Sequence, residues 1–305
     1  MEEKNKTAAL YVVATPLGNI ADITLRALDT LRAADAIACE DTRHTRRLLD
    51  HYDIRVPTFA LHEHNEAGAA QKLIGMLADG KRVALVSDAG TPGVSDPGAR
   101  AVAAVRTAGY PVIPLPGPNA AIAALSAAGL ADSEDAQFLF AGFLPSKPGA
   151  RRQRIEALRA IPAALVFYEA PHRIVETVAD LAELLEPART LVVARELTKL
   201  FEQIEAMPLP SGPAWLAADA NRQRGEFVLL VSAPPASEGL DAATLRTLQL
   251  LLAELPLKQA VKLAAEISGA PKNALYEQAL GSYRTVAAGR AEALKQLDRI
   301  DVAIR

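Results

Sequence analysis

The amino-acid sequence predicts two α/β domains followed by a small helical domain. Three observations support this fold class: apolar runs of strand length alternate with helical patterns up to about residue 235, loops rich in Gly and Pro follow several runs, and residues 242–302 show helical periodicity alone. With 305 residues, 50% of them hydrophobic, the chain can bury more than one core. We expect the domains at 1–125, 126–234 and 240–305.

Four short apolar runs predict the strands of the first domain. They lie at residues 10–14, 36–39, 82–86 and 111–114. A helical pattern through Leu25, Leu28 and Leu31 follows the first run. Strands that alternate with helices favour βαβ units and a mainly parallel sheet.

A second series of apolar runs begins near Gln137. The predicted strands are 138–141, 164–168, 190–194 and 226–231, with helices at 151–159 and 173–185. Residues 233–239 have the composition of a linker. Beyond it we expect a helix at 257–267, a turn at 268–271 and a helix at 272–280, packed through Leu263, Ile267, Leu275 and Leu280.

The composition excludes several classes of protein. There are 33 Lys and Arg against 36 Asp and Glu, which excludes a globally basic nucleic-acid binder. The single cysteine, Cys39, excludes a disulfide framework and a cysteine zinc site, and we expect no bound metal. The first residues lack the features of a signal peptide, and the longest nearly apolar stretch, 120–131, is too short to cross a bilayer. We therefore expect a soluble cytoplasmic protein without membrane contacts.

The charge is unevenly distributed along the chain. Residues 242–305 carry nine basic and six acidic side chains, whereas the rest of the chain is net negative. A second basic cluster comprises Lys147, Arg151, Arg152, Arg154 and Arg159. A solvated helix face explains one such cluster, but two of them on an acidic protein favour an anionic partner.

Three loops carry the strongest signal for a ligand site. Each follows a predicted strand and is rich in Gly, Pro and small residues: 14–19, 87–98 and 115–121. Ligands of open parallel sheets bind outside the carboxyl ends of the strands, and small residues let a ligand reach the backbone. The loops contain no phosphate-binding glycine motif and no basic residue. They predict a ligand that is rich in hydrogen-bonding groups but lacks phosphate, with Asp88 accepting from a ribose or an amine.

A series of motifs follows in a fixed order from residue 10 to residue 231. They are LYVVATPLGN (10–19), CEDTR (39–43), HEHNE (62–66), LVSDAGTPGVSDPG (85–98), PGPNA (116–120), GFLP (142–145), FYEAPHR (167–173), ARELTK (194–199) and GEF (225–227). In sequence and order they resemble the tetrapyrrole methylase superfamily and, within it, the RsmI family of small-subunit rRNA ribose 2'-O-methyltransferases.

The resemblance implies two α/β/α domains of the tetrapyrrole methylase type, not a Rossmann methyltransferase, with S-adenosylmethionine (SAM) in the cleft between them. It implies a homodimer that modifies a cytidine in the decoding region of small-subunit (16S) rRNA, either as free rRNA or in the assembled 30S subunit. The implied SAM contacts are Asp88, Ala89, Gly90, Thr91, Gly93, Val94, Ala120, Ala121, Ile122, Phe167, Tyr168, Ala194, Gly225, Glu226 and Phe227.

A ribose hydroxyl is weakly acidic, so its methylation needs a group that takes the proton or a nearby cation. The candidates are Lys199, Glu196, Glu169 and Glu63. Lys199 needs a lowered pKa to act as a base. Glu196 has the alternative role of pairing with Arg195 to orient the site.

Basic side chains of the chain are candidates for phosphate contacts, which position RNA without reading its sequence. In the tail they belong to a unit that resembles the helix-turn-helix at the end of this family's chains. The candidates are Arg43, Lys147, Arg151, Arg152, Arg154, Lys258, Lys262 and Lys272. For the segment Asp41-Thr-Arg43, an alternative is that Asp41 caps the following helix.

Two other functions remain open on the sequence. One is methylation of a precorrin or a diphthamide precursor by another member of the superfamily. Against it stand the two basic clusters and the CEDTR and ARELTK segments, which match the rRNA branch. The other is a SAM- or RNA-binding module without catalysis, since the residues do not identify the proton acceptor.

Overall fold

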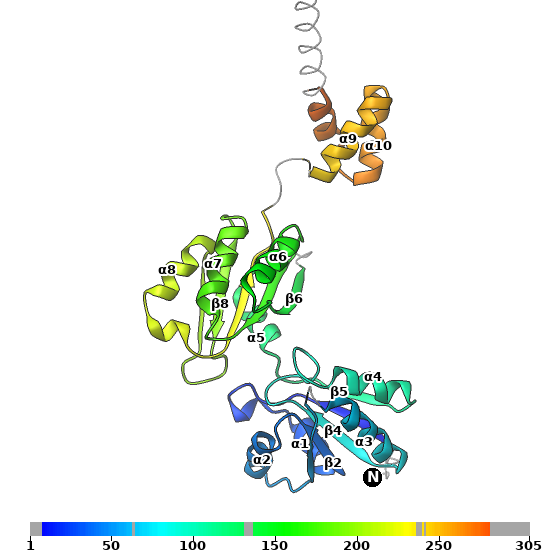
Figure 1. Ribbon diagram of the computed structural model, residues 1–305, viewed down its shortest axis with the longest axis vertical. Helices are drawn as coiled ribbons and strands as arrows, with labels where there is room; N and C mark the ends of the chain where they lie inside the picture. Colours follow the sequence, from blue (N-terminus) through cyan, green and yellow to red (C-terminus); the bar gives the residue numbers. More distant parts are fainter. Residues whose placement is uncertain (1–7, 63–64, 131–136, 236–239, 241, 281–305) are drawn as a thin grey trace, which may run out of the picture. The chain divides into compact units, whose positions relative to one another are not determined.

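The structure, a computed structural model, describes residues 8–62, 65–130, 137–235, 240 and 242–280 (Figure 1). The chain divides into two compact units, Met1–Pro235 and Ala236–Arg305. The described residues of the first unit form two five-stranded sheets, and the described part of the second unit is helical. The boundary that we predict at residue 125 stays a prediction. It falls inside α5 (Ala120–Ala128), a helix that packs against the second sheet.

The first sheet is parallel throughout, with the strand order β3-β2-β4-β1-β5. Its strands are β1 (Ala9–Val13), β2 (Ala36–Cys39), β3 (Thr58–Ala60), β4 (Arg82–Val86) and β5 (Val112–Leu115). The sequence predicts all of them except β3, because an edge strand of three residues is too short to give a periodic pattern.

Helices cover both faces of the first sheet (Figure 1). They are α1 (Leu25–Ala33), α2 (Thr42–His51), α3 (Glu66–Ala78) and α4 (Ala99–Thr107). On one face, Leu31 of α1 and Leu49 of α2 pack with Ile37 of β2. On the other face, Leu73 of α3 packs with Leu10 of β1. The first sheet and its helices therefore have the α/β/α layering that the resemblance implies.

The second sheet has the order β6-β7-β10-β8-β9 and is mixed. Its strands are β6 (Phe138–Phe143), β7 (Ala164–Glu169), β8 (Thr190–Arg195), β9 (Gln203–Pro208) and β10 (Phe227–Val231). The expectation of a mainly parallel arrangement is wrong here, because β10 runs antiparallel to both β7 and β8, and β9 runs antiparallel to β8. The sequence does not predict β9, an edge strand that buries little apolar surface.

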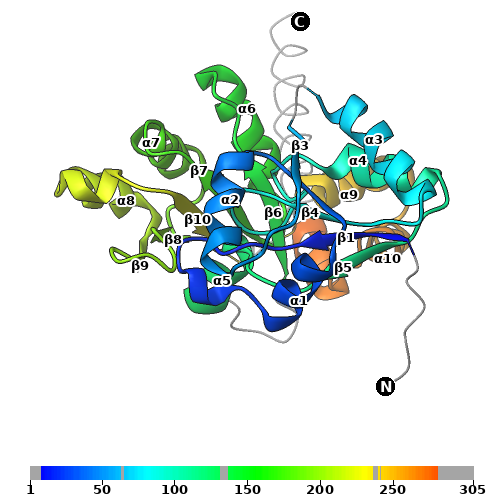
Figure 2. The same cartoon turned by 90° about the horizontal axis from the view of Figure 1, so that it is seen from below.

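The second sheet is also covered on both faces (Figure 2). One face packs against α6 (Pro148–Arg159), α7 (Ile174–Leu184) and α8 (Gly212–Ala217). On the opposite face Ala121 and Ala124 of α5 contact Val228 and Leu230 of β10. The small side chains of α5 let it lie close to this face, next to the loops that end the first sheet.

The described part of the second unit contains α9 (Ala242–Glu254), α10 (Leu257–Ser268) and helical backbone over residues 272–280. Gly269, with φ of 72°, ends α10 at the predicted turn. The packing of Leu275 is confirmed, but that of Leu263, Ile267 and Leu280 is wrong, since these are 38%, 66% and 39% exposed. For Leu263 and Ile267 the reason is that α10 buries its small side chains, at positions 260, 261, 264 and 265. In the described part of the chain, no helix has the length and apolar character needed to cross a membrane.

Candidate functional site

The three predicted loops meet at one edge of the first sheet. They leave β1, β4 and β5, which are neighbours in the order β4-β1-β5. Thr15 and Gly90 exchange backbone hydrogen bonds of 2.9 Å, and the Thr91 hydroxyl donates to the carbonyl of Pro118 at 2.9 Å. A Cβ on Gly117 would lie 2.8 Å from the Cβ of Ala14, so this close approach of two loops requires glycine.

A cavity of about 420 Å³, here called the loop pocket, opens at these loops and is bounded on its other side by the second sheet. Its volume lies in the range of small-molecule sites, about 300–1,000 Å³. Part of its wall is made by implied SAM contacts, namely Asp88, Ala89, Gly90, Thr91, Val94, Ala120, Tyr168, Glu226 and Phe227.

Six of the implied contacts are not part of this wall: Gly93, Ala121, Ile122, Phe167, Ala194 and Gly225. Phe167 and Ala194 are fully buried in the two hydrophobic clusters of the second sheet. Successive strand residues point to opposite faces, so Phe167 points away from the face that Tyr168 occupies. Because side chains alternate between the two faces of a strand, the sequence alone indicates that only one of these two neighbours faces the pocket.

The pocket also contains residues that the sequence reasoning missed. They are Leu17, Glu40, Ser95, Asp96, Phe143, Ala170, Pro171, Leu197 and Val228. Many of them, including Glu40, Asp96 and Phe143, stand inside the quoted motifs, so the motifs marked the right segments without indicating which side chains face inward.

The loop pocket is electronegative. Burial raises the pKa of Asp96 to about 6, the nearby charge of Glu40 adds to this, and a hydrogen bond from Ser87 opposes it. Burial and the charge of Asp88 also raise the pKa of Glu40. None of the described residues that line the pocket is Lys or Arg. Such a site favours a cation and disfavours a phosphate.

Aromatic side chains form the part of the wall that faces these acids. The hydroxyl of Tyr168 accepts a hydrogen bond of 3.2 Å from the backbone N–H of Ala121, which leaves its own proton available to another acceptor. Its ring contacts Phe140 and Phe143 edge to face. Burial raises the pKa of Tyr168, so the hydroxyl stays protonated at neutral pH. The pocket thus combines carboxylates, backbone groups and aromatic surface.

Lys199 is held by two carboxylates. Its Nζ lies 2.9 Å from Oε1 of Glu196 and 2.7 Å from Oε2 of Glu226. Burial alone would lower the pKa of Lys199, but the hydrogen bonds to Glu226 and Glu196 outweigh it and raise the pKa. The direction is opposite to what a general base requires, so Lys199 is a cation at neutral pH.

Glu196 belongs to the same arrangement. Burial opposes the charge on Glu196, but bonds from Lys199 and from the backbone N–H of Glu226 (3.0 Å) lower its pKa. Its φ of 50° is in the left-handed region, and the loop that it begins reaches the loop after β1, where the Thr198 hydroxyl accepts from the backbone N–H of Asn19 at 3.1 Å. Glu196 therefore anchors both the loop and Lys199.

Glu169 lies in the wall of the loop pocket, yet its carboxylate is fully used within the protein. Its side chain is 0% exposed and accepts hydrogen bonds from Thr177 (2.6 Å) and from the backbone N–H of Ala170 (2.8 Å). Nε of Arg173 lies 3.3 Å away. The fourth candidate, Glu63, lies outside the described residues.

The segment at the start of α2 has a structural role. Asp41 caps the helix by accepting from the backbone N–H of Arg43 at 2.8 Å, which confirms the capping interpretation. The Arg43 guanidinium pairs with the same carboxylate at 3.0 Å, and its side chain is 88% exposed. Its hydrogen bonds to Arg43 hold the pKa of Asp41 low, at about 2. Arg43 remains accessible to an external anion.

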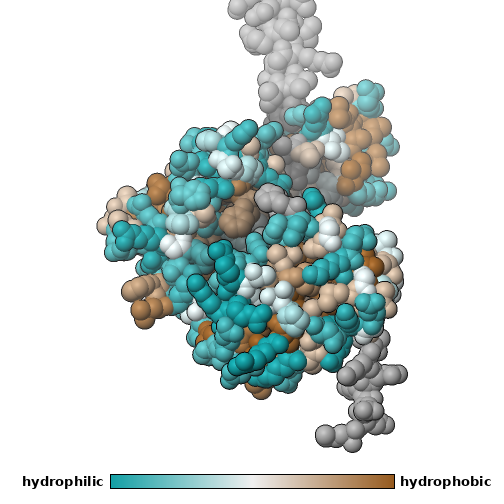
Figure 3. Space-filling model, turned by 60° about the horizontal axis from the view of Figure 1, so that its bottom comes forward, coloured by the Kyte–Doolittle hydropathy of each residue, from teal (hydrophilic) through white to brown (hydrophobic). Residues whose placement is uncertain are grey.

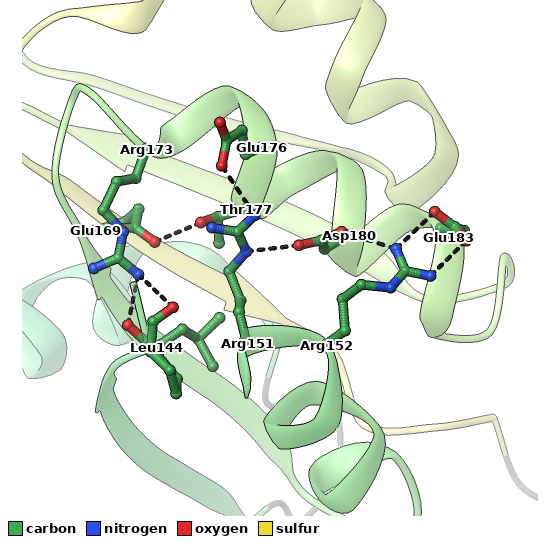
Figure 4. A network of polar contacts seen from close by, with 10 residues as sticks. Leu144, Arg151, Arg152, Glu169, Arg173, Glu176, Thr177, Asp180 and Glu183 are labelled. Carbon is green, nitrogen blue, oxygen red and sulfur yellow. Dashed lines mark hydrogen bonds and ion pairs between the residues drawn. The ribbon is translucent and has the colours of Figure 1, made fainter. Parts of the chain in front are cut away.

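Two arginines of the basic cluster, both on α6, pair with acids of α7 (Figure 4), and a third, Arg159, pairs with Glu186. Arg151 contacts Asp180 at 2.6 Å and Glu176 at 3.1 Å, with only 3% of its side chain exposed. Arg152 contacts Asp180 at 2.9 Å and Glu183 at 2.6 Å. These pairs join the two helices. Lys147 and Arg154 of the same cluster are exposed.

We predict that Arg151→Met lowers the free energy of unfolding by about 3 kcal/mol, because it removes the buried guanidinium that pairs with Asp180, whose side chain is only 13% exposed. Arg154→Met, on the exposed side of the same helix, is the matched control, with an expected change within about 0.5 kcal/mol. Urea denaturation of both variants measures the difference. Equal stability of the two variants would show that Arg151 does not stabilise the helix pair.

The basic candidates of the second unit are all exposed: Lys258, Lys262 and Lys272. Only Lys262 has an ion pair among the described residues, with Glu266 at 3.9 Å. An exposed i,i+4 pair of this kind contributes a few tenths of a kcal/mol, so all three side chains remain available to an anion.

Comparisons with known proteins place this geometry in a family. The model of the tetrapyrrole (corrin/porphyrin) methylases matches residues 9–211, and the model of the RsmI C-terminal helix-turn-helix domain matches residues 238–282. The chain is 51% identical over 274 residues to ribosomal RNA small subunit methyltransferase I of Pseudomonas aeruginosa, covering 89% of this chain and 96% of that protein. It is 52% identical over 277 residues to the protein of the same name from Escherichia coli O157:H7, covering 90% and 96%.

Solved structures share the fold at lower identity. The methyltransferase CobJ matches with a TM-score of 0.56 and 22% identity, over 77% of this chain and 97% of that one. Uroporphyrin-III C-methyltransferase from Thermus thermophilus, complexed with S-adenosylhomocysteine, matches with a TM-score of 0.52 and 17% identity, over 73% and 97%. The match extends over most of each of these chains.

Proposed function

Because the chain belongs to the tetrapyrrole methylase family, and within it to the small-subunit rRNA methyltransferases I, we propose that it methylates the ribose 2'-OH of a cytidine in the decoding region of small-subunit rRNA. The general activity, SAM-dependent methylation of small-subunit rRNA, follows because about half of the residues are identical to those of these methyltransferases over nine-tenths of the chain. The position of the methyl group is the part that we propose.

The loop pocket is the observation that carries the cofactor assignment. SAM is a cation at its sulfonium and its amino group, and the pocket offers Glu40, Asp88 and Asp96. Residues 88–91 follow β4 and line the pocket, and the small side chains at 89 and 90 let a nucleoside come close to the backbone there. The aromatic surface of Tyr168 and Phe143 suits an adenine ring. Volume, charge and surface chemistry therefore all fit SAM.

When bound, SAM supplies an electrophilic methyl group: the O–C bond forms as the C–S bond breaks, sulfur keeps the electron pair, and the 2'-hydroxyl proton leaves to a base. The protein contributes orientation and electrostatics. Lys199, which is protonated, supplies positive charge for an oxygen that loses its proton. Glu196 fixes the position of Lys199, and Glu169 fixes the turn that follows β7.

The ionisation of the acids decides which of them can accept a proton. Glu196 has a lowered pKa and is held by Lys199, so it is a weak base. Asp96, with a pKa of about 6, is a stronger base than an ordinary carboxylate and lines the loop pocket. Lys199, which is protonated at neutral pH, is not available as the proton acceptor.

The exposed basic candidates supply the proposed phosphate contacts. They are Arg43, Lys147, Arg154, Lys258, Lys262 and Lys272, with the half-exposed Arg152 at the edge of its ion-pair network. Each neutralised phosphate makes binding more salt-dependent. Arg151 is not among the proposed phosphate contacts, because its guanidinium is buried and pairs with Glu176 and Asp180. Its role is to join α6 and α7.

We propose that the protein is a cytoplasmic homodimer. Apolar side chains reach the surface in several groups (brown in Figure 3), and Leu200 and Phe201 are 89% and 69% exposed. Exposed apolar surface of this kind favours association with another protein surface. Light scattering after size-exclusion chromatography tests it: we expect twice the chain mass of 32.3 kDa, and a monomer would contradict the proposal.

Mapping of the methyl group tests the proposed position. Small subunits from cells that lack this enzyme are incubated with the protein and labelled SAM, and the RNA is digested to nucleosides for mass spectrometry. We expect the label on the ribose of a cytidine. Label on a base, or on another nucleoside, would contradict the proposed position while leaving the methyltransferase activity intact.

Asp96 gives a pH-dependent cofactor affinity. Since the pKa of Asp96 is about 6, it carries a charge at pH 7 and is largely protonated at pH 5. We expect the affinity for SAM to fall by up to about tenfold from pH 7 to pH 5, as the attracting charge is lost. Calorimetry at both values measures this change.

The control is Asp96→Asn, in which we expect most of the pH dependence of SAM affinity to disappear. The part that remains comes from Glu40. Stability of the free protein changes in the opposite direction: with a pKa raised from 3.8 to about 6, Asp96 stabilises the folded chain at low pH and loses this contribution as pH rises through about 6. An unchanged pH dependence of SAM binding in the variant would contradict the assignment.

A further inference from the structure

A second cavity, of about 520 Å³, lies next to the loop pocket. We call it the α2 pocket, because His44 and Arg47 of α2 line it together with Lys199. It shares four wall residues with the loop pocket: Leu17, Asp88, Ala89 and Glu226. A molecule in the α2 pocket therefore lies beside one in the loop pocket.

The two cavities differ in charge. The loop pocket has acids and no Lys or Arg among its described lining residues, whereas the α2 pocket adds His44, Arg47 and Lys199 to the two acids that both pockets share, Asp88 and Glu226. A cationic cofactor suits the first pocket, and in the second the basic side chains of α2 offer contacts to an anionic group of the acceptor. Since the two pockets share four wall residues, their occupants lie next to each other.

The basic residues of α2 divide into paired and unpaired ones. Arg43 pairs with Asp41, and Arg46 donates to the carbonyl of Val56 and to Thr58 on the side of the first sheet. The side chains of His44 and Arg47, which are exposed, make no hydrogen bond or ion pair with any residue that the structure describes. They stand three positions apart and so share one face of the helix.

We propose that the α2 pocket binds the acceptor nucleotide, with Arg47 and His44 holding a phosphate next to the ribose that is methylated. This assignment rests on the proposed function and adds the place where the substrate binds. Arg47 provides a planar donor pair that matches a phosphate. Lys199, clamped by Glu196 and Glu226, is the cation on the side shared with the loop pocket. The acceptor ribose then lies between the phosphate contacts of α2 and the cofactor.

Single and double alanine variants of Arg47 and His44 test this proposal. The control is Arg55→Ala, which removes the same charge from an exposed position just after α2 that lines neither pocket. Methyl transfer from SAM to isolated small subunits is measured over a range of subunit and salt concentrations, and SAM binding is measured by calorimetry.

For Arg47→Ala we expect the KM for subunits to rise about tenfold, because the variant loses a hydrogen bond to a charged group. The slope of log KM against log salt should decrease by about 0.7 for each lost phosphate contact. SAM affinity should stay unchanged, and Arg55→Ala should behave as wild type. A purely structural role of Arg47 would change SAM binding and thermal stability as well.

The outcomes separate this inference from the proposed function. If the wild-type protein methylates subunits and Arg47→Ala matches Arg55→Ala in KM and salt slope, the α2 pocket is not the acceptor site and only this inference fails. If the wild-type protein transfers no methyl group to subunits, the proposed function fails and the inference with it.

Discussion

Replacement of Glu169 by alanine is expected to lower the free energy of unfolding by about 3–5 kcal/mol. The carboxylate is fully buried, and three groups depend on it: the Thr177 hydroxyl, the Ala170 backbone N–H and the Arg173 guanidinium. Without it, the N–H and the hydroxyl lose their acceptor inside the protein and the guanidinium loses its counter-charge. Denaturant unfolding of the variant, compared with wild type, measures the change.

The control for this prediction is Glu176→Ala on the same helix, α7. The Glu176 side chain is 65% exposed, so that its loss should cost less than about 1 kcal/mol. Glu169→Gln keeps the shape and separates structure from chemistry. If this variant is as stable as wild type yet transfers no methyl group, Glu169 acts in the reaction itself and the structural role that we assign is wrong.

Replacement of Asp88 by asparagine is expected to weaken SAM binding about 10- to 100-fold, because the cofactor loses a hydrogen bond to a charged group. Asp88 stands at the end of β4 and lines both pockets. Its Oδ1 accepts from the backbone N–H of Asp41 at 3.1 Å, and an asparagine oxygen can keep that bond. The substitution therefore removes charge with little change in shape, and calorimetry with SAM measures the effect.

Asp50→Asn is the matched control for Asp88→Asn, because Asp50 is exposed in α2 and lines neither pocket. Its SAM affinity should equal that of the wild type. An unchanged affinity of Asp88→Asn would mean that SAM does not bind in the loop pocket.

Much of the fold follows from local patterns. The strands β1, β2, β4 and β7 are buried, β-branched or apolar runs, and the turn at Gly269 lies where the sequence places it. The antiparallel direction of β10 does not follow, since a buried strand has the same composition whichever way it runs. The edge strands β3 and β9 escape prediction because they are short or half-exposed.

The site was predictable at the level of loops but less so at the level of side chains. The motifs identify segments 87–98 and 167–173, but tertiary contacts decide that Asp96 and Tyr168 face the loop pocket while Phe167 does not. Arg151 pairs with Asp180, which is distant in sequence, so the basic cluster alone does not reveal the ion pairs that the structure shows. The raised pKa of Lys199 likewise depends on Glu226, which no local pattern connects to it.

The most direct measurement is transfer of a labelled methyl group from SAM to isolated small subunits by the wild-type, Asp88→Asn and Asp50→Asn proteins. We predict that the wild-type and Asp50→Asn proteins label small-subunit rRNA equally, and that Asp88→Asn does so only at raised SAM concentration. Absence of label with the wild-type protein, or full labelling by Asp88→Asn at low SAM concentration, would contradict an rRNA methyltransferase that binds SAM in the loop pocket.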